Sequence, residues 1–392
     1  MTKDSMSTDG VFKRRNTVFS GQFPMFLALN FLLGGGLLAG CTEEKKEGAK
    51  TPVVSTFAGS ERCGYRDGTG TDARFYGPSG IAVDRAGNLY VADSEEDSMP
   101  DNIKGRIGKI SPAGEVSTFV GSAYEDGTGA DLGVLLPRGI HIDASDNLYV
   151  TDADRIRKIT PTGEISTLAG DNSFRYRDGT GAEAWFASPS GIALDRAGNL
   201  YVADSHNHRI RKITPAGEVS TFAGGGTCQP TTNPECTSTG NPEDTYRDGT
   251  GAEARFKFPK GIAMDASGNL YVADSGNNRI RKITPAGEVS TFAGDGTDGY
   301  RDGTGAEAQF DWPNDIAIDR AGNLYVADTV NRRIRKLTPA GEVSTLAGDG
   351  TRDYRDGTGT EAQFERPIGI ALDGAGDLYV ADGCLIRKIT FE

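Results

Sequence analysis

The hydrophobic residues of this chain fall in short runs that polar turn residues interrupt at regular intervals. Residues 191–195 (GIALD) and 199–204 (NLYVAD) are apolar runs bounded by Gly, Asp and Asn, which predicts two buried β-strands. The DRAGN string at 195–199 predicts a tight hairpin between them, because Asp and Asn bond to local backbone and Gly adopts positive φ. Residues 209–224 (RIRKITPAGEVSTFAG) predict a third strand, a second hairpin and a fourth strand.

This four-strand unit recurs along the chain. The string NLYVAD or a near copy ends at six aspartates: Asp93, Asp152, Asp204, Asp274, Asp328 and Asp382. A unit repeated at this spacing buries its faces against its neighbours rather than alone. Six units of four antiparallel strands predict an all-β, six-bladed β-propeller, and the 54 glycines fit its many tight turns.

The two ends of the repeat array predict how the ring closes. The last unit stops at residues 385–390 (LIRKIT) and so lacks its fourth strand. Val53–Ala58 (VVSTFA) precedes the first unit and reads as a spare fourth strand. We therefore expect Val53–Ala58 to complete blade six, so that residues 53–392 form a single closed domain.

The units resemble NHL repeats, through residues 189–193 (PSGIA), 198–204 (GNLYVAD) and 207–210 (NHRI). The resemblance covers essentially all of residues 53–392 and implies the β-propeller fold. What it implies for function is broad. Members of this family include protein- and RNA-binding modules, extracellular sensor domains and a lyase that cleaves hydroxyglycine peptides.

The N-terminal segment differs in kind from the repeats. Basic residues at 13–15 precede an apolar run from Met25 to Leu38, which predicts a signal peptide and is too short and too glycine-rich to span a bilayer well. Residues 38–41 (LAGC) resemble the bacterial lipobox, in which the cysteine, here Cys41, becomes the lipidated first residue. A plain signal peptide or membrane anchor with an incidental cysteine is the alternative.

These features predict residues 1–40 as signal peptide and 41–52 as a lipidated cysteine with a polar tether. Removing 1–40 changes the net charge from −13 to −15, and a surface of this charge repels nucleic acid and anionic lipid. We expect a bacterial envelope protein attached to the membrane through Cys41. Thr42 favours the outer membrane and Glu43-Glu44 also suits the cell surface, both ahead of the inner membrane.

Candidate binding residues lie at the predicted channel mouth. The loops after the second and fourth strands are expected on one face, with the tight hairpins on the other, and long loops carry function more often. The residue after each unit's first proline varies among otherwise near-identical units: Ser79, Arg138, Ser190, Lys260, Asn314 and Ile368. Together with Asp315 they predict a ring that holds a small anionic or polar group; a solvated rim is the alternative.

Two other repeated patterns favour structural roles. The aspartates of the RDGTG strings, such as Asp178, supply too few oxygens for calcium and are expected to form turns. Asp204 with Arg209, and the equivalent pairs, are expected to be structural pairs within a blade. Trp312 and Trp185 could stack on sugar or peptide, although recurring phenylalanines in the same loops favour packing between blades.

An enzymatic role is the weaker expectation. The lyase of the resembled family uses several histidines around zinc, whereas this chain has His141, His206 and His208 only, on two units. Gluconolactonase-like propellers hold a metal with acidic and amide groups, but Arg138 and Lys260 would repel a cation at this mouth. No catalytic or cofactor-binding string is present, so no catalytic residue, metal or cofactor is assigned.

The cysteines beyond Cys41 are even in number, which in an exported chain predicts disulfides. Cys228 and Cys236 bracket one inserted loop and are paired locally, which leaves Cys63 and Cys384 to join the two chain ends. Free thiols are the alternative. The sequence thus predicts a monomeric, non-enzymatic binding or scaffold propeller for a protein, peptide or glycan, with a propeller lyase or lactone hydrolase as the alternative, and a mainly structural array as a third.

Overall fold

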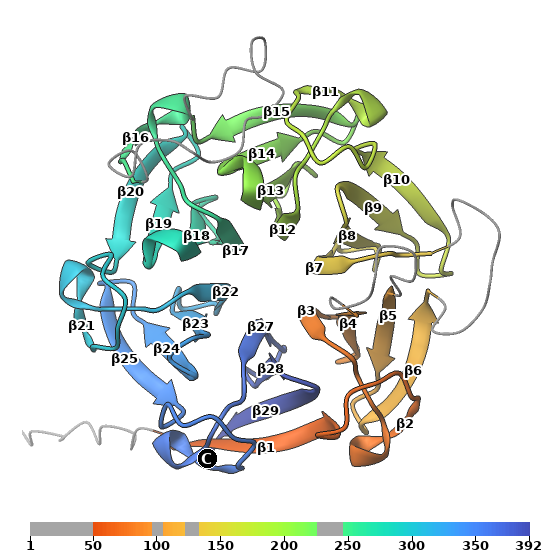
Figure 1. Cartoon of the computed structure of the whole chain (residues 1–392), viewed down its shortest axis with the longest axis vertical. Helices are drawn as coiled ribbons and strands as arrows, with labels where there is room; N and C mark the ends of the chain where they lie inside the picture. Colours follow the sequence, from red (N-terminus) through yellow and green to blue (C-terminus); the bar gives the residue numbers. More distant parts are fainter. Residues whose placement is uncertain (1–49, 96–104, 122–132, 226–245) are drawn as a thin grey trace, which may run out of the picture. The chain divides into compact units, whose positions relative to one another are not determined.

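The computed structural model describes residues 50–95, 105–121, 133–225 and 246–392, which form a ring of six β-sheets around a central channel (Figure 1). The six-bladed β-propeller predicted from the repeats is confirmed. Each blade is one sequence unit, and the chain visits the blades in order around the ring. In the described part of the chain, no helix has the length and hydrophobicity of a membrane span.

Blade three shows how the repeated sequence builds a sheet. From the channel outward its strands are β12 (Pro189–Leu194), β13 (Leu200–Asp204), β14 (Arg209–Ile213), β15 (Glu218–Ala223) and β11 (Gly179–Thr180). In the first hairpin, the Asp195 carboxylate accepts the backbone N–H groups of Ala197 and Asn199 at 2.9 and 2.8 Å. Gly198 supplies the positive φ of that turn, at 85°.

The same strands recur in the other blades, again from the channel outward. Blade one has β3 (Pro78–Val83), β4 (Leu89–Ser94), β5 (Gly105–Ile110), β6 (Glu115–Val120) and β2 (Gly68–Thr69). Blade two has β7 (Pro137–Ile142), β8 (Leu148–Asp152), β9 (Arg155–Ile159) and β10 (Ile165–Ala169). Blade four has β17 (Pro259–Met264), β18 (Leu270–Asp274), β19 (Arg279–Ile283), β20 (Glu288–Ala293) and β16 (Gly249–Thr250). Blade five has β22 (Pro313–Ile318), β23 (Leu324–Asp328), β24 (Arg333–Leu337), β25 (Glu342–Ala347) and β21 (Gly303–Thr304).

Blade six joins the two ends of the ring. Its strands are β27 (Pro367–Leu372), β28 (Leu378–Asp382), β29 (Leu385–Phe391), β1 (Pro52–Gly59) and β26 (Gly357–Thr358). β1 pairs antiparallel with β29 from Pro52 opposite Phe391 to Gly59 opposite Leu385. The prediction that the N-terminal strand completes blade six is confirmed, with one more residue at each end than Val53–Ala58.

The four strands predicted for each blade are present, and among the described residues blades one, three, four, five and six carry a two-residue fifth strand in addition. The RDGTG segments form this strand at the outer edge, and each runs into a short 3-10 helix. The 3-10 helices of these segments are Gly70–Asp72, Gly181–Glu183, Gly251–Glu253, Gly305–Glu307 and Gly359–Glu361, with two more after second strands at Ser205–Asn207 and Ser275–Asn277. The RDGTG segments therefore pair with the fourth strands at the outer edges of the blades.

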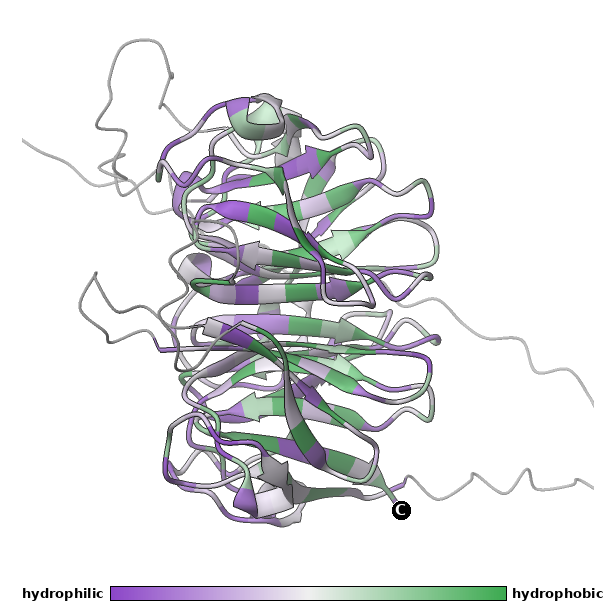
Figure 2. Ribbon diagram, turned by 90° about the vertical axis from the view of Figure 1, so that its right-hand side faces the viewer, coloured by the Kyte–Doolittle hydropathy of each residue, from purple (hydrophilic) through white to green (hydrophobic). Residues whose placement is uncertain are grey.

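The apolar core lies between neighbouring blades. One cluster joins Ala193 and Tyr201 of blade three to Phe256, Ile262 and Leu270 of blade four. The phenylalanines that recur before each first strand are buried in these clusters: Phe75, Phe186, Phe256, Phe310 and Phe364. Their expected role in packing between blades is confirmed, and Figure 2 shows the apolar strand centres stacked side by side.

In the five blades whose RDGTG segment the structure describes, a buried arginine ties the blade to that segment. Arg211 is fully buried and donates to Asp204 at 2.7 Å and to Asp178 at 2.6 Å. Asp204 and Arg209, expected to form a structural pair, lie opposite each other on β13 and β14. The Asp204 carboxylate, however, binds Arg211, and the guanidinium of Arg209 lies over the ring of Tyr176, at 4.2 Å from its centroid. The RDGTG aspartates serve as ion-pair partners, beyond the turn role expected of them.

Candidate ligand site at the channel mouth

The first strands of all six blades line one cavity of about 780 Å³ at the centre of the ring. Below the rim, the cavity wall is built mainly from Ile and Ala residues of the first strands, with His141 in the alanine position of β7. The residues predicted as a ring are all in its lining: Ser79, Arg138, Ser190, Lys260, Asn314, Asp315 and Ile368. A cavity of this volume is large enough for a small ligand or the end of a chain.

A bulge at the start of each first strand aims these residues at the mouth. In blade three, Pro189 pairs with Asp204 and Ile192 with Val202, so Ser190 and Gly191 face a single residue of β13. A Cβ atom on Gly191 would lie 2.4 Å from the carbonyl oxygen of Lys260 in the next blade. Only glycine permits this close approach, so the side chain before it turns toward the channel.

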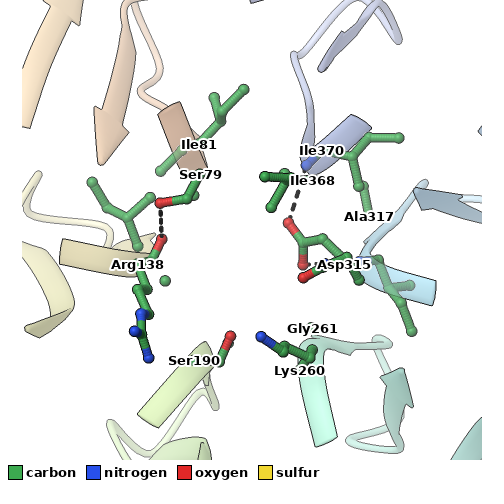
Figure 3. A pocket seen from close by; sticks show the side chains of 18 of the residues that line it. Ser79, Ile81, Arg138, Ser190, Lys260, Gly261, Asp315, Ala317, Ile368 and Ile370 are labelled. Carbon is green, nitrogen blue, oxygen red and sulfur yellow. Dashed lines mark hydrogen bonds between the residues drawn. The ribbon is translucent and has the colours of Figure 1, made fainter. Parts of the chain in front are cut away.

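Two cations converge on one side of the mouth. Figure 3 shows the side chains of Arg138, from blade two, and Lys260, from blade four, extending toward Ser190 of blade three. Both cations are close to His206, in the loop after β13. Burial and the charges of Arg138 and Lys260 lower the pKa of its imidazole. This side of the mouth therefore has a positive potential although the chain as a whole has a net charge of −13.

The other ring residues differ in their roles. Ser79 Oγ lies 3.2 Å from the carbonyl oxygens of Ala92 and Arg138 and 3.3 Å from that of Pro137, so it joins blade one to blade two. Ile368 contributes an apolar patch, and Asn314 is half-buried at the rim. The structure thus brings the predicted ring together at the mouth, with Ser79 held by backbone partners.

Asp315 stands where the equivalent residue of every other blade is glycine. Its Oδ1 accepts the N–H of Ile316 at 2.9 Å, and its Oδ2 accepts the N–H of Ile370 on blade six at 3.0 Å (Figure 3). Burial raises the pKa of this carboxyl to about 7, and the two N–H donors offset the rise only in part. A carboxyl that titrates near neutral pH therefore lies in the upper wall of the channel.

The histidines do not gather. His141 takes an alanine position on β7 inside the channel, and burial lowers its pKa to about 4. His206 and His208 lie on the loop after β13 at the rim. Within the residues that the structure describes, no three His, Cys, Asp or Glu side chains are placed to hold a metal ion together.

The two tryptophans separate. Trp185 stacks between the guanidinium groups of Arg175 and Arg177, with its ring centroid at 5.9 and 5.2 Å. Trp312 is 36% exposed and immediately precedes the first strand of blade five. Its counterpart in blade four is Phe258, which the sequence analysis missed. The signal was available, because the residue before the first proline also varies between units: Gly77, Leu136, Ser188, Phe258, Trp312 and Arg366.

A disulfide joins Cys63 to Cys384 at the edge of the same cavity. Its Cα atoms are 5.3 Å apart, and the bond spans 321 residues of sequence. The pair predicted to join the chain ends is thus bonded in the structure. Cys41, Cys228 and Cys236 lie outside the described residues.

Comparison with protein families places two models on the chain. The NHL repeat matches residues 75–96 and 310–337, and the teneurin NHL domain matches residues 180–284. Among curated proteins, the chain is 30% identical over 285 residues to Protein SUPPRESSOR OF QUENCHING 1, chloroplastic, of Arabidopsis thaliana. That match covers 70% of this chain and 26% of the relative, so the chain spans about a quarter of the relative's length.

Solved structures share the fold at low identity. An auxiliary nutrient binding protein from Bacteroides ovatus aligns with a TM-score of 0.63 and 18% identity, over 88% of this chain and 77% of that one. A streptogramin B lyase aligns with a TM-score of 0.51 and 15% identity, over 87% of this chain and 98% of that one. At these identities the alignments show a common fold, and binding proteins and enzymes both occur on it.

Proposed function

The chain belongs to the NHL-repeat β-propeller family, and on that premise we propose that it is a binding or scaffold protein of the bacterial envelope. Its ligand, a protein, a peptide or a glycan, enters the channel mouth on the face that carries the loops after the second and fourth strands. The protein acts there as a monomer.

One observation carries this proposal: near-identical blades diverge where they meet the cavity. The hairpin, strand and RDGTG sequences repeat almost unchanged, whereas the residue after each first proline is Ser, Arg, Ser, Lys, Asn or Ile. These six side chains line one cavity of about 780 Å³. Identical blades would suffice for the fold, so the variation at the mouth is best explained by a ligand.

The envelope location rests on the N-terminal sequence. The apolar run from Met25 to Leu38 ends in the lipobox-like string at 38–41, and we propose that lipid on Cys41 anchors the propeller through a short tether. Expression in a bacterial host with detergent phase partition tests it. The wild type is expected in the detergent phase and Cys41→Ala in the aqueous phase; equal partition of the two would remove the anchor.

Binding at the mouth is tested by capture from envelope protein and polysaccharide extracts on immobilised protein. The test variant is Arg138→Ala/Lys260→Ala/Asn314→Ala. The control is Arg85→Ala/Arg196→Ala, which removes the same two charges from exposed hairpin tips on the opposite face. We expect the control to capture as much ligand as the wild type, and the triple variant to capture at least tenfold less. Equal recovery by all three proteins would exclude the mouth.

An enzymatic function is the second candidate, and the raised pKa of the Asp315 carboxyl is the observation that favours it. A channel carboxyl with a pKa of about 7 is suited to general acid–base chemistry near neutral pH. A lyase or lactone hydrolase of this kind would lose activity in Asp315→Asn. A stoichiometric metal in the purified protein, found by elemental analysis, would support the enzymatic function. The binding function does not require a metal.

A further inference from the structure

Most of the exposed large apolar side chains lie on the loop face of the ring. Across the described ranges they are Leu135, Phe174, Tyr300, Trp312 and Val330, at 36% to 55% exposure. Leu135 and Trp312 precede first strands, Val330 follows a second strand, and Phe174 follows the fourth strand β10. Tyr300 is the exception, because its ring covers the guanidinium of Arg333 at 3.8 Å on the outer part of blade five. Exposed apolar groups that gather on one face mark an interaction site.

Two of these side chains belong to a continuous set of rings, which we call the aromatic arc: Phe174, His206, His208, Phe258 and Trp312. The ring centroids follow one another at 5.5 Å from Phe174 to His206, 5.3 Å from His206 to Phe258, and 6.1 Å from Phe258 to Trp312. His208 lies 4.7 Å from Phe258. The arc therefore runs across blades three, four and five on the loop face, outside the residues that line the cavity. Its member His206 is close enough to Arg138 and Lys260 for their charges to lower its pKa.

The backbone holds the arc in an unusual conformation. Phe174, Phe258 and Trp312 have positive φ values of 45°, 48° and 55°, which bulky residues rarely adopt. Phe258 and Trp312 also precede prolines, where helical conformations are further disfavoured. Such strain persists where surrounding contacts impose it, and it concentrates at binding and active sites.

The backbone at Phe258 and Trp312 is held by the preceding blade. The N–H of Phe258 donates to His208 Nδ1 at 3.0 Å, and the N–H of Trp312 donates to Asn278 Oδ1 at 2.9 Å. These bonds cross from blade three to four and from blade four to five. The rings are thus presented in preset orientations, which reduces the entropy that a ligand must overcome on binding.

The channel side of the arc is cationic. Lys260 follows Phe258 by two residues on the same blade, and Arg138 reaches toward Ser190 from the other side (Figure 3). Asp154 is an acidic residue near His206, and its Oδ1 accepts the N–H of Ser188 at 2.8 Å. Its charge raises the pKa of His206, but by less than either cation lowers it. A ligand that lies on the arc and enters the mouth therefore meets positive charge.

The backbone donors of the arc are already used, so recognition must come from ring faces and side chains. Sugar rings suit this arrangement, because their polarised C–H faces stack on the electron-rich faces of aromatic rings. A carboxylate on the sugar pairs with guanidinium or ammonium. A peptide strand would instead need free backbone partners.

We propose that the aromatic arc with Arg138 and Lys260 binds a uronic-acid oligosaccharide, one sugar ring lying on Phe258 and Trp312 and its carboxylate meeting the cations. This inference rests on the proposed binding function and names the ligand class of the same mouth. A neutral sugar or an aromatic acidic peptide would be a different ligand for that mouth, and the test separates them.

Isothermal titration with trigalacturonate and with its methyl ester tests the inference, because the ester removes charge and keeps the sugar rings. We expect the wild type to bind the acid at least tenfold more tightly than the ester. Trp312→Ala should lose at least tenfold affinity for both, and Lys260→Ala should lose the preference for the acid. Trp185→Ala, which removes the other tryptophan, should bind like the wild type, and thermal melts confirm that each variant is folded.

The inference is overturned if trigalacturonate does not bind, if acid and ester bind equally, or if Trp312→Ala binds like the wild type. Its failure is distinguishable from failure of the proposed function. If trigalacturonate does not bind but the mouth triple variant still loses a ligand that the hairpin control retains, the mouth is a binding site for another class. If both tests are negative, the binding function fails as well.

Discussion

The backbone N–H of Phe258 donates a hydrogen bond to Nδ1 of His208, 3.0 Å away, across the boundary between blades three and four. This bond requires that Nδ1 carry no proton. Burial, together with the charges of His206, Arg209 and Lys257, lowers the pKa of His208 to about 4 from 6.5. The bond is therefore intact at neutral pH.

The stability of this junction should depend on pH. Between pH 6.5 and 4 the unfolded chain takes up a proton at His208 that the folded chain does not, so the free energy of unfolding falls as the solution is acidified. His208→Asn keeps an acceptor, as Asn278 does for Trp312, and removes the titration. Urea denaturation at pH 7 and pH 4.5 should show a smaller loss for His208→Asn than for the wild type; equal losses would contradict the assignment.

Each buried arginine pairs with two aspartates, one buried and one exposed, and these two ion pairs should differ in their contribution to stability. In blade four, Arg281 pairs with fully buried Asp274 at 2.9 Å and with 47% exposed Asp248 at 2.7 Å. Removing the charge of a buried partner leaves the guanidinium uncompensated and costs about 3–5 kcal/mol, whereas an exposed partner contributes about 1 kcal/mol or less. Chemical denaturation should therefore rank Asp274→Asn far below Asp248→Asn in stability. Similar losses in the free energy of unfolding for the two variants would show that burial of the aspartate does not set its contribution to stability.

The bond between Cys63 and Cys384 should stabilise the closed ring. A link across 321 residues restricts the unfolded chain, and the loop-entropy model gives about 5 kcal/mol as an upper value. Cys63→Ala should lower the unfolding midpoint under oxidising conditions and remove its sensitivity to reductant. Intact mass before and after reduction counts the bonds, and a second bond would be that between Cys228 and Cys236. A midpoint in the wild type that reductant does not change would contradict the prediction.

Asp315 should give the opposite pH dependence to His208. Its pKa is raised from 3.8 to about 7, so the folded chain retains a proton that the unfolded chain releases, and its contribution to stability falls as pH rises from about 4 to 7. Relative to the wild type, Asp315→Asn should gain stability between pH 5 and pH 8. Asp315→Gly, which restores the residue of the other blades, should show the same trend. A constant difference across this range would contradict a carboxyl that titrates near neutral pH.

The fold could be read from the sequence because local pattern and global topology agree. The NLYVAD strings give the strands, and the displaced strand at Val53–Ala58 gives the closure. The ring from Ser79 to Ile368 followed from the same reasoning, because repetition makes any variation visible. In each case the inference needed only the position of a residue within its unit.

Contacts that depend on how far and in which direction a side chain extends could not be predicted from the position of a residue within its unit. Arg209 and Arg211 occupy the same face of β14, so spacing alone did not tell which of them binds the Asp204 carboxylate. In the structure Arg211 binds both Asp204 and Asp178, and Asp178 comes from the RDGTG segment. The aromatic arc also escaped, because its rings come from different loops of three blades. His206 and Phe258, for example, become neighbours only when blades three and four are placed side by side.

The most direct test of the account uses two positions on blade five, at opposite faces. A photoreactive diazirine amino acid is introduced at Asn314, in the mouth, or at Arg320, on an exposed hairpin tip, and each protein is irradiated in the native envelope fraction. The account predicts a discrete crosslinked product from position 314 and none from position 320. A product from position 320 alone, or none from position 314, would contradict it.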